Sequence, residues 1–254
     1  MKVKPKKHLG QHFLRDFSVA KRMADMVVNT HLPMLEIGAG TGVLTQFLVQ
    51  KKFNLHAVEI DMEAIQYLKH NFAPQDFTLY EQDFLTLDIS ALPTPIVWIG
   101  NLPYNISSQV FFKLWENCAH VPEAIFMVQK EVALRLSGKP NSKEYGILSV
   151  LLQLEYQITY AFTVPPHVFE PPPKVYSGVI HLIKKTSPLI YPREKLLKLV
   201  KVAFNQRRKI LKNSIKSLCN KEIDIDINGR NILGYRAEQL PPEAFLKLLD
   251  ALHD

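Results

Sequence analysis

Short apolar segments alternate with amphipathic segments over the first half of this 254-residue chain. Each apolar segment has the length of a strand, and the segments between them carry apolar side chains at helical spacing. This alternation predicts βαβ units and an α/β fold, in which helices cover both faces of a parallel sheet. The predicted strands span residues 34–40, 55–61, 77–83, 96–102 and 123–129, and the predicted helices span residues 18–30, 41–52, 62–72 and 107–118. Ser18 is placed to cap the first of these helices.

The pattern changes in the second half of the chain. Residues 154–162 and 176–185 are two longer strand candidates. The Pro-rich segment between them is too short for a crossover helix, so we expect an antiparallel pair at the edge of the sheet. Residues 195–218 and 241–252 have helical apolar spacing, and prolines open the second segment. The pattern predicts a domain over 1–187, which includes a basic N-terminal tail at 1–17, and a helical domain over 188–254.

Charge is distributed unevenly along the chain. Residues 1–183 contain 16 Lys+Arg and 16 Asp+Glu, whereas residues 184–254 contain 15 and 8 and so carry the whole net charge of +7. The first 22 residues hold seven basic side chains against Asp16 alone. A neutral body with two basic regions indicates an anionic polymer as partner. A solvated surface without a partner is the alternative interpretation of the same charges.

Composition also bounds the class of protein. The apolar share of 47% is enough for one sizeable core with a small appendage. No apolar run approaches the roughly 18 residues that span a bilayer, and the basic N-terminus has no apolar stretch of a secretory signal. The two cysteines, Cys118 and Cys219, have no CxxC spacing. We therefore expect a reduced, cytoplasmic protein without a metal site.

A glycine-rich segment, LEIGAGTG at 35–42, joins the end of one predicted strand to the start of a helix. Its G-x-G-x-G spacing is one residue shorter than the dinucleotide fingerprint, and no phosphate-binding lysine or arginine accompanies it. Glu59 ends the next strand, where it can bind paired ribose hydroxyls, and Asp83 ends the third, where it can accept from an adenine amine. Together they predict a site for an adenosine without phosphates, such as S-adenosyl-L-methionine. A plain turn flanked by solvated acids is the alternative.

The fourth predicted strand ends in Asn101-Leu102-Pro103-Tyr104. An adenine amine is a poor nucleophile because its lone pair is delocalised into the ring. The Asn101 side-chain oxygen and the Leu102 carbonyl can accept its two protons, and Tyr104 can stack on the base. Phe169, in the Pro-rich segment, is the candidate for a second aromatic wall around an extruded base. This arrangement would catalyse by positioning and electrostatics. The alternative interpretation of Asn101–Tyr104 is an ordinary turn between a strand and a helix, and the preceding glycine loop, Glu59 and Asp83 argue against it.

An ordered series of motifs extends over essentially the whole chain: LGQHFLRD, LEIGAGTG, VEID, QDFL, NLPYNIS, KEYGILSVLLQ, VPPHVFEPPPKVYSGVI and AFNQRRKILKNSI. The series resembles the KsgA/Dim group of ribosomal RNA adenine dimethyltransferases. The resemblance implies a Rossmann-like class I methyltransferase fold, with a mostly parallel seven-stranded sheet and a small C-terminal α-helical domain. It also implies N6,N6-dimethylation of two adjacent adenosines in the 3′-terminal hairpin of 16S ribosomal RNA, within an assembling 30S particle, by a monomeric enzyme that uses S-adenosyl-L-methionine.

The resemblance assigns roles to single residues. The residues expected at the cofactor are His12, Leu14, Gly38, Gly40, Glu59, Asp83 and Asn101. The residues expected at the target adenine are Asn101, Leu102, Tyr104 and Phe169. His12 stands where the family often has asparagine, and its ring can still hydrogen-bond.

A basic run in the C-terminal segment contains no acid. We interpret it as a phosphate-contacting helix that positions RNA without reading its sequence. A solvated helix face is the alternative. The residues expected to bind RNA are Arg207, Arg208, Lys209 and Lys212.

Three other functions compete with this hypothesis. An Erm-like enzyme would methylate large-subunit RNA, but the C-terminal AFNQRRKILKNSI segment resembles the small-subunit enzymes. A non-catalytic assembly factor could keep the fold, but the intact NLPY motif and cofactor acids argue against it. A DNA adenine methyltransferase would use the same chemistry, but no segment is large enough for a target-recognition domain.

Overall fold

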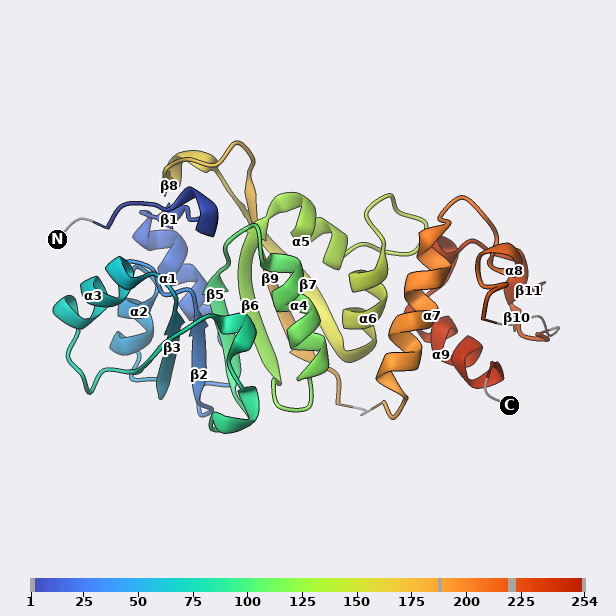
Figure 1. Cartoon of the computed structure of the whole chain (residues 1–254), viewed down its shortest axis with the longest axis horizontal. Coiled ribbons are helices and arrows are strands. Elements are labelled where there is room, and N and C mark those ends of the chain that lie inside the picture. Colours follow the sequence, from blue (N-terminus) through green and yellow to red (C-terminus); the bar gives the residue numbers. More distant parts are fainter. Residues whose placement is uncertain (1–2, 187–188, 219–222, 253–254) are drawn as a thin grey trace. The chain divides into compact units, whose positions relative to one another are not determined.

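Seven strands form one sheet in the order β4-β3-β2-β5-β6-β9-β7 in the computed structural model, which describes residues 3–186, 189–218 and 223–252 (Figure 1). The strands are β2 (Met34–Ile37), β3 (Leu55–Glu59), β4 (Thr78–Glu81), β5 (Val97–Asn101), β6 (Glu123–Gln129), β7 (Tyr156–Val164) and β9 (Ser177–Lys184). The pairs from β4 through β6 are parallel. The predicted α/β fold with a mostly parallel seven-stranded sheet is therefore confirmed.

The central strands are mostly apolar, and nearly all of their residues are buried. Every residue of β2 and β3 is buried, and so is every residue of β5 except the last. Parallel strands whose connections run over both faces have no solvated face, so they show no polar alternation. The connections include α2 (Thr45–Gln50), α3 (Met62–Asn71) and α4 (Ser107–Glu116), which lie within the predicted helices.

The last two strands are neighbours at one edge of the sheet, as the sequence predicts. β9 pairs antiparallel with β6, and β7 lies beyond β9 at the edge. The sequence analysis did not assign the helices α5 (Lys130–Leu136) and α6 (Ile147–Glu155), which lie between β6 and β7 along the chain.

The N-terminal segment is held against the first unit along its described length. Its β1 (Phe13–Leu14) pairs antiparallel with β8 (Phe169–Glu170) of the Pro-rich segment. The helix α1 (Phe17–Asp25) begins one residue earlier than predicted, and its cap is Asp16. The Asp16 carboxylate accepts from the backbone N–H of Ser18 at 2.8 Å, so the prediction that Ser18 is the cap was wrong.

The chain divides into two compact units. The first comprises Met1–Ala133 and Gln157–Lys184, and the second comprises Leu134–Tyr156 and Lys185–Asp254. The predicted boundary between residues 187 and 188 falls outside the described residues. Within the described chain, no helix combines the length and apolarity needed to span a membrane.

The second unit is mainly helical, and its helices pack α6, α7 (Arg193–Asn205) and α9 (Pro242–Ala251) against one another. Pro242 occupies the first turn of α9, as predicted. The continuous helix predicted over 195–218 was wrong, because α7 ends at Asn205 and a short helix, α8 (Leu211–Ser214), follows. Gln206 has φ −117° and ψ 58°, which is not helical.

The remaining short elements connect these helices and strands. Two two-residue strands, β10 (Asp226–Ile227) and β11 (Arg230–Asn231), form a hairpin in the second unit. The single-turn 3₁₀ helices are η1 (Lys7–Leu9), η2 (Phe84–Thr86), η3 (Ile89–Ala91), η4 (Pro166–Val168), η5 (Ile232–Gly234) and η6 (Ala237–Gln239).

Candidate active site

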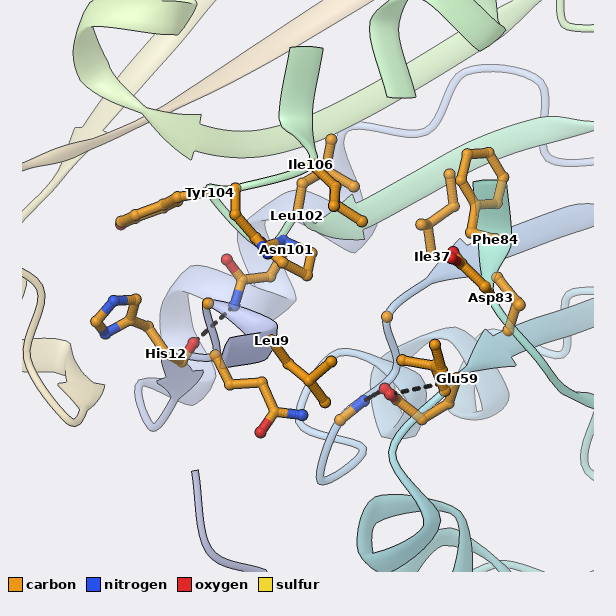
Figure 2. Close-up of a pocket in the computed structure, with 18 of the residues that line it drawn as sticks. Leu9, His12, Ile37, Glu59, Asp83, Phe84, Asn101, Leu102, Tyr104 and Ile106 are labelled. Carbon is orange, nitrogen blue, oxygen red and sulfur yellow. Dashed lines mark hydrogen bonds between the residues drawn. The ribbon is translucent and has the colours of Figure 1, made fainter. Parts of the chain in front are cut away.

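An open cavity of about 860 Å³ lies where β2, β3 and β5 end and where η2 follows β4 (Figure 2). The carboxyl ends of parallel strands meet at one edge of a sheet, which is where such folds bind ligands. The cavity brings together most of the predicted site residues: His12, Gly38, Gly40, Glu59, Asp83, Asn101, Leu102 and Tyr104. The sequence analysis missed the apolar part of the lining, which includes Leu9, Phe13, Ile37, Ile60 and Phe84.

The glycine loop forms the wall after β2. Gly38 has φ +72° and Gly40 has φ +56°, a left-handed conformation that side chains disfavour. A Cβ on Gly40 would also lie 3.2 Å from the ring of Phe13. Glycine at these positions therefore lets the loop turn while the N-terminal segment packs on it.

Glu59 fixes this loop to the end of β3. Its carboxylate is buried and accepts three backbone N–H groups, from Gly40 and Ile60 at 2.8 Å and from Asp61 at 2.9 Å. Burial raises the pKa of Glu59, and these three hydrogen bonds oppose the rise. A carboxylate offers about four lone-pair positions, so one remains for a ligand hydroxyl.

Glu36 is a buried acid to which the sequence analysis gave no role. It is 1% exposed, and its Oε2 has no hydrogen-bond partner within the described structure. Burial raises the pKa of Glu36 to about 8; the nearby Thr45 opposes this rise and the charge of Glu59 adds to it. Glu36 lines a smaller pocket that shares Gly38, Gly40 and Asn101 with the main cavity. An unsatisfied buried carboxyl oxygen at this point fits a cationic donor on a ligand.

Asp83 lies on the turn that follows β4. Its Oδ1 accepts from the backbone N–H of Leu85 at 2.8 Å and caps η2. Phe84 lies beside it, buried, with its ring edge-on to Trp98 at 5.1 Å between centroids. The capped turn presents a carboxylate next to an aromatic wall, as an adenine amine would require.

The acceptor segment, Asn101–Tyr104 at the end of β5, is joined to the N-terminal segment. The Nδ2 of Asn101 donates to the backbone oxygen of His12 at 3.1 Å, which Figure 2 shows as a dashed line. This bond orients the amide and leaves Oδ1 as an acceptor. The Leu102 N–H donates to the carbonyl of Met127 at 3.0 Å, which fixes the acceptor segment against β6.

Two rings line this part of the cavity: that of Tyr104, at the end of the acceptor segment, and that of His12, in the N-terminal segment. The Tyr104 hydroxyl hydrogen-bonds Ser177 Oγ at 2.6 Å, and burial raises the pKa of Tyr104. The His12 Nδ1 lies 2.7 Å from the carbonyl oxygen of Pro171. Because a carbonyl only accepts, Nδ1 carries the proton. The His12 and Tyr104 rings are 5.2 Å apart between centroids, so His12 lies beside the predicted base-stacking residue as well as on the cavity wall.

Two predicted residues lie outside the main cavity lining. Leu14 and Phe169 are 5% and 3% exposed, belong to the same hydrophobic cluster and are backbone partners in the β1–β8 pair. The role of Phe169 as an aromatic wall stays a prediction.

The predicted RNA-binding residues belong to the second unit. Arg207 pairs with Glu238 and donates to the carbonyl of Lys143 at 2.8 Å, whereas Arg208, Lys209 and Lys212 are exposed. The described residues contain no group of three or more His, Cys, Asp or Glu side chains that could hold a metal ion.

Comparison with known proteins bears on this site. The family model for ribosomal RNA adenine dimethylase matches residues 2–254. The ribosomal RNA small subunit methyltransferase A of Phocaeicola vulgatus is 49% identical over 250 residues, which cover 97% of this chain and 89% of that protein. The protein of the same name from Parabacteroides distasonis is 49% identical over 249 residues, which cover 97% and 93%.

Two solved structures share the fold over nearly the whole chain. A dimethyladenosine transferase from Plasmodium falciparum has a TM-score of 0.80 at 25% identity, over 95% of this chain and 98% of that chain. The 23S rRNA methyltransferase ErmE has a TM-score of 0.68 at 23% identity, over 95% and 100%. The fold is that of class I methyltransferases.

Glu36→Gln should make the ligand-free protein less sensitive to alkaline pH. Because the pKa of Glu36 is raised from 4.5 to about 8, the folded chain keeps a proton that the unfolded chain releases as the pH rises. Stability therefore falls between these pH values, and glutamine removes that loss. The variant should exceed the wild type by on the order of 4 kcal/mol in unfolding free energy at pH 8 and come within about 1 kcal/mol of it near pH 5.

Urea denaturation at both pH values measures this difference. Replacement of the exposed Glu131 by glutamine controls for the loss of one carboxylate. An equal difference between E36Q and wild type at both pH values would contradict the assignment.

Proposed function

This chain belongs to the ribosomal RNA adenine dimethylase family, and we propose that it transfers methyl groups from S-adenosyl-L-methionine to the exocyclic amine of adenosines in ribosomal RNA. One observation carries the proposal: a single cavity joins two acids suited to an adenosine ligand, Glu59 and Asp83, with the Asn101–Tyr104 acceptor segment, and the adjoining smaller pocket adds Glu36. Neither half would be sufficient alone. An adenosine site without the acceptor segment would indicate binding, and the segment without the acids would be a turn.

The residues present fit S-adenosyl-L-methionine. Glu36, with its unsatisfied buried oxygen, would hold the amino group of the methionine part. Glu59 would accept from a ribose hydroxyl, and Asp83 would accept from the adenine amine. The bound cofactor supplies an electrophilic methyl group on a sulfonium.

The acceptor segment prepares the target amine. Asn101 is held by the His12 backbone, so its Oδ1 can accept one proton of the amine, and the Leu102 carbonyl can accept the other. Two acceptors at fixed positions favour the pyramidal nitrogen that attacks a methyl group. Tyr104, held by Ser177, would stack on the base. These residues act by positioning and by preorganised electrostatics.

We infer that the substrate is small-subunit RNA. The support comes from curated relatives named ribosomal RNA small subunit methyltransferase A, which align with 97% of this chain at 49% identity. The proposed reaction is dimethylation of two adjacent adenosines in the 3′-terminal hairpin of 16S RNA in an assembling 30S particle, by a cytoplasmic monomer. An Erm-like activity on large-subunit RNA is the alternative, because ErmE shares the fold.

We further infer that an exposed basic surface binds RNA phosphates. It consists of Arg208, Lys209 and Lys212, which lie in the turn after α7 and in α8. Arg207 is excluded from this surface, because its guanidinium pairs with Glu238 and donates to the carbonyls of Ser142 and Lys143.

Methyl transfer to purified ribosomal subunits tests the proposed function. We expect label from S-adenosyl-L-methionine to enter unmethylated 30S subunits and to be recovered as dimethyladenosine after nucleoside digestion. Label in 50S subunits alone would move the assignment to the Erm-like activity. No label in either would support a non-catalytic assembly factor.

Asn101→Ala should all but stop methyl transfer under multiple-turnover conditions, because the amide oxygen is one of the two amine acceptors. Loss of one preorganised acceptor costs on the order of 10²–10³-fold in kcat. The Kd of S-adenosylhomocysteine should change only a few-fold, since Glu59 and Asp83 remain. The checks are single-turnover rates and calorimetric titration, and a turnover near that of the wild type would remove Asn101 from the mechanism.

Neutralising the basic surface should flatten the salt dependence of RNA binding. In the triple variant R208Q/K209Q/K212Q, the slope of log K against log salt should decrease by about 0.7–0.9 for each lost phosphate contact. The matched control is R207Q, which should lower the melting temperature but leave the slope nearly unchanged. Filter binding to a hairpin RNA over a salt series measures both. A slope equal to that of the wild type in the triple variant would place the RNA elsewhere.

A further inference from the structure

The side chain of Lys113 reaches from α4 to the turn that bears Asp83. Its Nζ donates to three backbone carbonyls of this turn: Phe84 at 2.7 Å, Leu85 at 2.9 Å and Leu87 at 2.6 Å. The side chain is half-buried, and Nζ lies 4.9 Å from the centroid of the Phe84 ring. An ammonium has three donors, so all of them are used on one turn.

The other hydrogen bonds of this turn are local: the backbone N–H groups of Thr86 and Leu87 donate to the carbonyls of Asp83 and Phe84, both at 3.2 Å. Asp83 caps the start of η2 through Leu85, and Thr86 Oγ1 donates to the Asp83 carbonyl at 3.0 Å. Carbonyls at the end of a short helix lack intrahelical partners and carry partial negative charge. Lys113 satisfies these carbonyls with a charged donor, which makes stronger hydrogen bonds than a neutral one.

The helix that carries Lys113 also begins at the acceptor segment. Ser107, the first residue of α4, donates from Oγ to the carbonyl of Tyr104 at 3.1 Å. The same helix therefore contacts the acceptor segment at its start and the Asp83 turn near its end.

We propose that Lys113 is a positioning residue that sets the adenine selectivity of the cofactor pocket by fixing the turn of Asp83. The inference rests on the proposed function in taking the ligand to be an adenosine. Without Lys113, three carbonyls lose their charged donor, and among the described residues only that of Phe84 keeps a backbone one, the Leu87 N–H. The turn then relaxes, so the Asp83 carboxylate no longer has one orientation. A ligand that carries the adenine amine then loses affinity, whereas a ligand without the amine loses little.

The test compares two ligands that differ at that amine. The Kd values of S-adenosylhomocysteine and of its deaminated analogue, S-inosylhomocysteine, are measured by calorimetry for each protein. The ratio of the two Kd values cancels any loss of folded protein, so a purely structural defect leaves it unchanged. The wild type should favour the adenosyl ligand by on the order of 100-fold or more, because a site built for an amine rejects an analogue that lacks it.

In Lys113→Met the ratio should fall about tenfold, with the Kd of the inosyl ligand within about twofold of the wild type. Lys113→Arg should recover part of the ratio, because a guanidinium also donates to carbonyls. Lys184 offers a matched control: its half-buried Nζ donates to the carbonyl of Cys118 at 2.6 Å, and it does not line the cavity. Lys184→Met should lower the melting temperature and leave the ratio unchanged.

An unchanged ratio in K113M, or an equal fall in K184M, would overturn the inference. If K113M does not fold, Lys113→Gln carries the same test with a neutral donor. A wild type that binds both ligands equally would overturn the inference together with the role of Asp83. An intact ratio without methyl transfer to either ribosomal subunit would instead contradict the proposed function and leave the role of Lys113 standing.

Discussion

The buried carboxylate of Glu59 joins parts of the site that are far apart in sequence. It accepts the N–H of Gly40 and so holds the glycine loop against the end of β3. It also accepts the N–H of Asp61, whose own side chain accepts from Gln11 at 2.9 Å and pairs with Lys6. The N-terminal segment is thereby fastened to the same strand end. Two walls of the cavity depend on one strand terminus, because polar groups there are buried and must all find partners.

The part of the site that follows from strand order could be predicted from sequence. Gly38, Glu59, Asp83 and Asn101 each come at the end of a strand or just after it, and parallel strands place these ends at one edge. A short local pattern was therefore enough to predict that they meet. Their chemistry was equally local, because the closely spaced glycines and the acids that end the strands are visible in the sequence. The structure gives Gly38 and Gly40 the positive φ that such a loop requires.

The features that the sequence analysis did not predict depend on contacts between residues distant in sequence. The helix predicted over 195–218 breaks after Asn205, and Arg207 just beyond the break pairs with Glu238. Lys6, in the segment predicted to be a basic tail, pairs with Asp61, which lies 55 residues further along the chain. Phe169 sits in the core because β8 pairs with β1. The spacing of apolar residues along the chain does not predict these contacts, because they are ion pairs and backbone hydrogen bonds between residues far apart in sequence.

The acids of the pocket and the excess basic residues lie in different segments of the chain. This separation allows an acidic pocket in a protein whose proposed substrate, RNA, is a polyanion. Burial raises the pKa of Glu36 to about 8, so a proton offsets its negative charge near neutral pH when no ligand is bound. Residues 1–183 are electrically balanced, and the excess of basic residues lies beyond them. A potential that attracts phosphates can therefore come from the exposed surface of Arg208, Lys209 and Lys212. The pocket itself needs no basic lining, so its acids can serve the recognition of an adenosine. Affinity for RNA can therefore change without a change in the residues of the pocket.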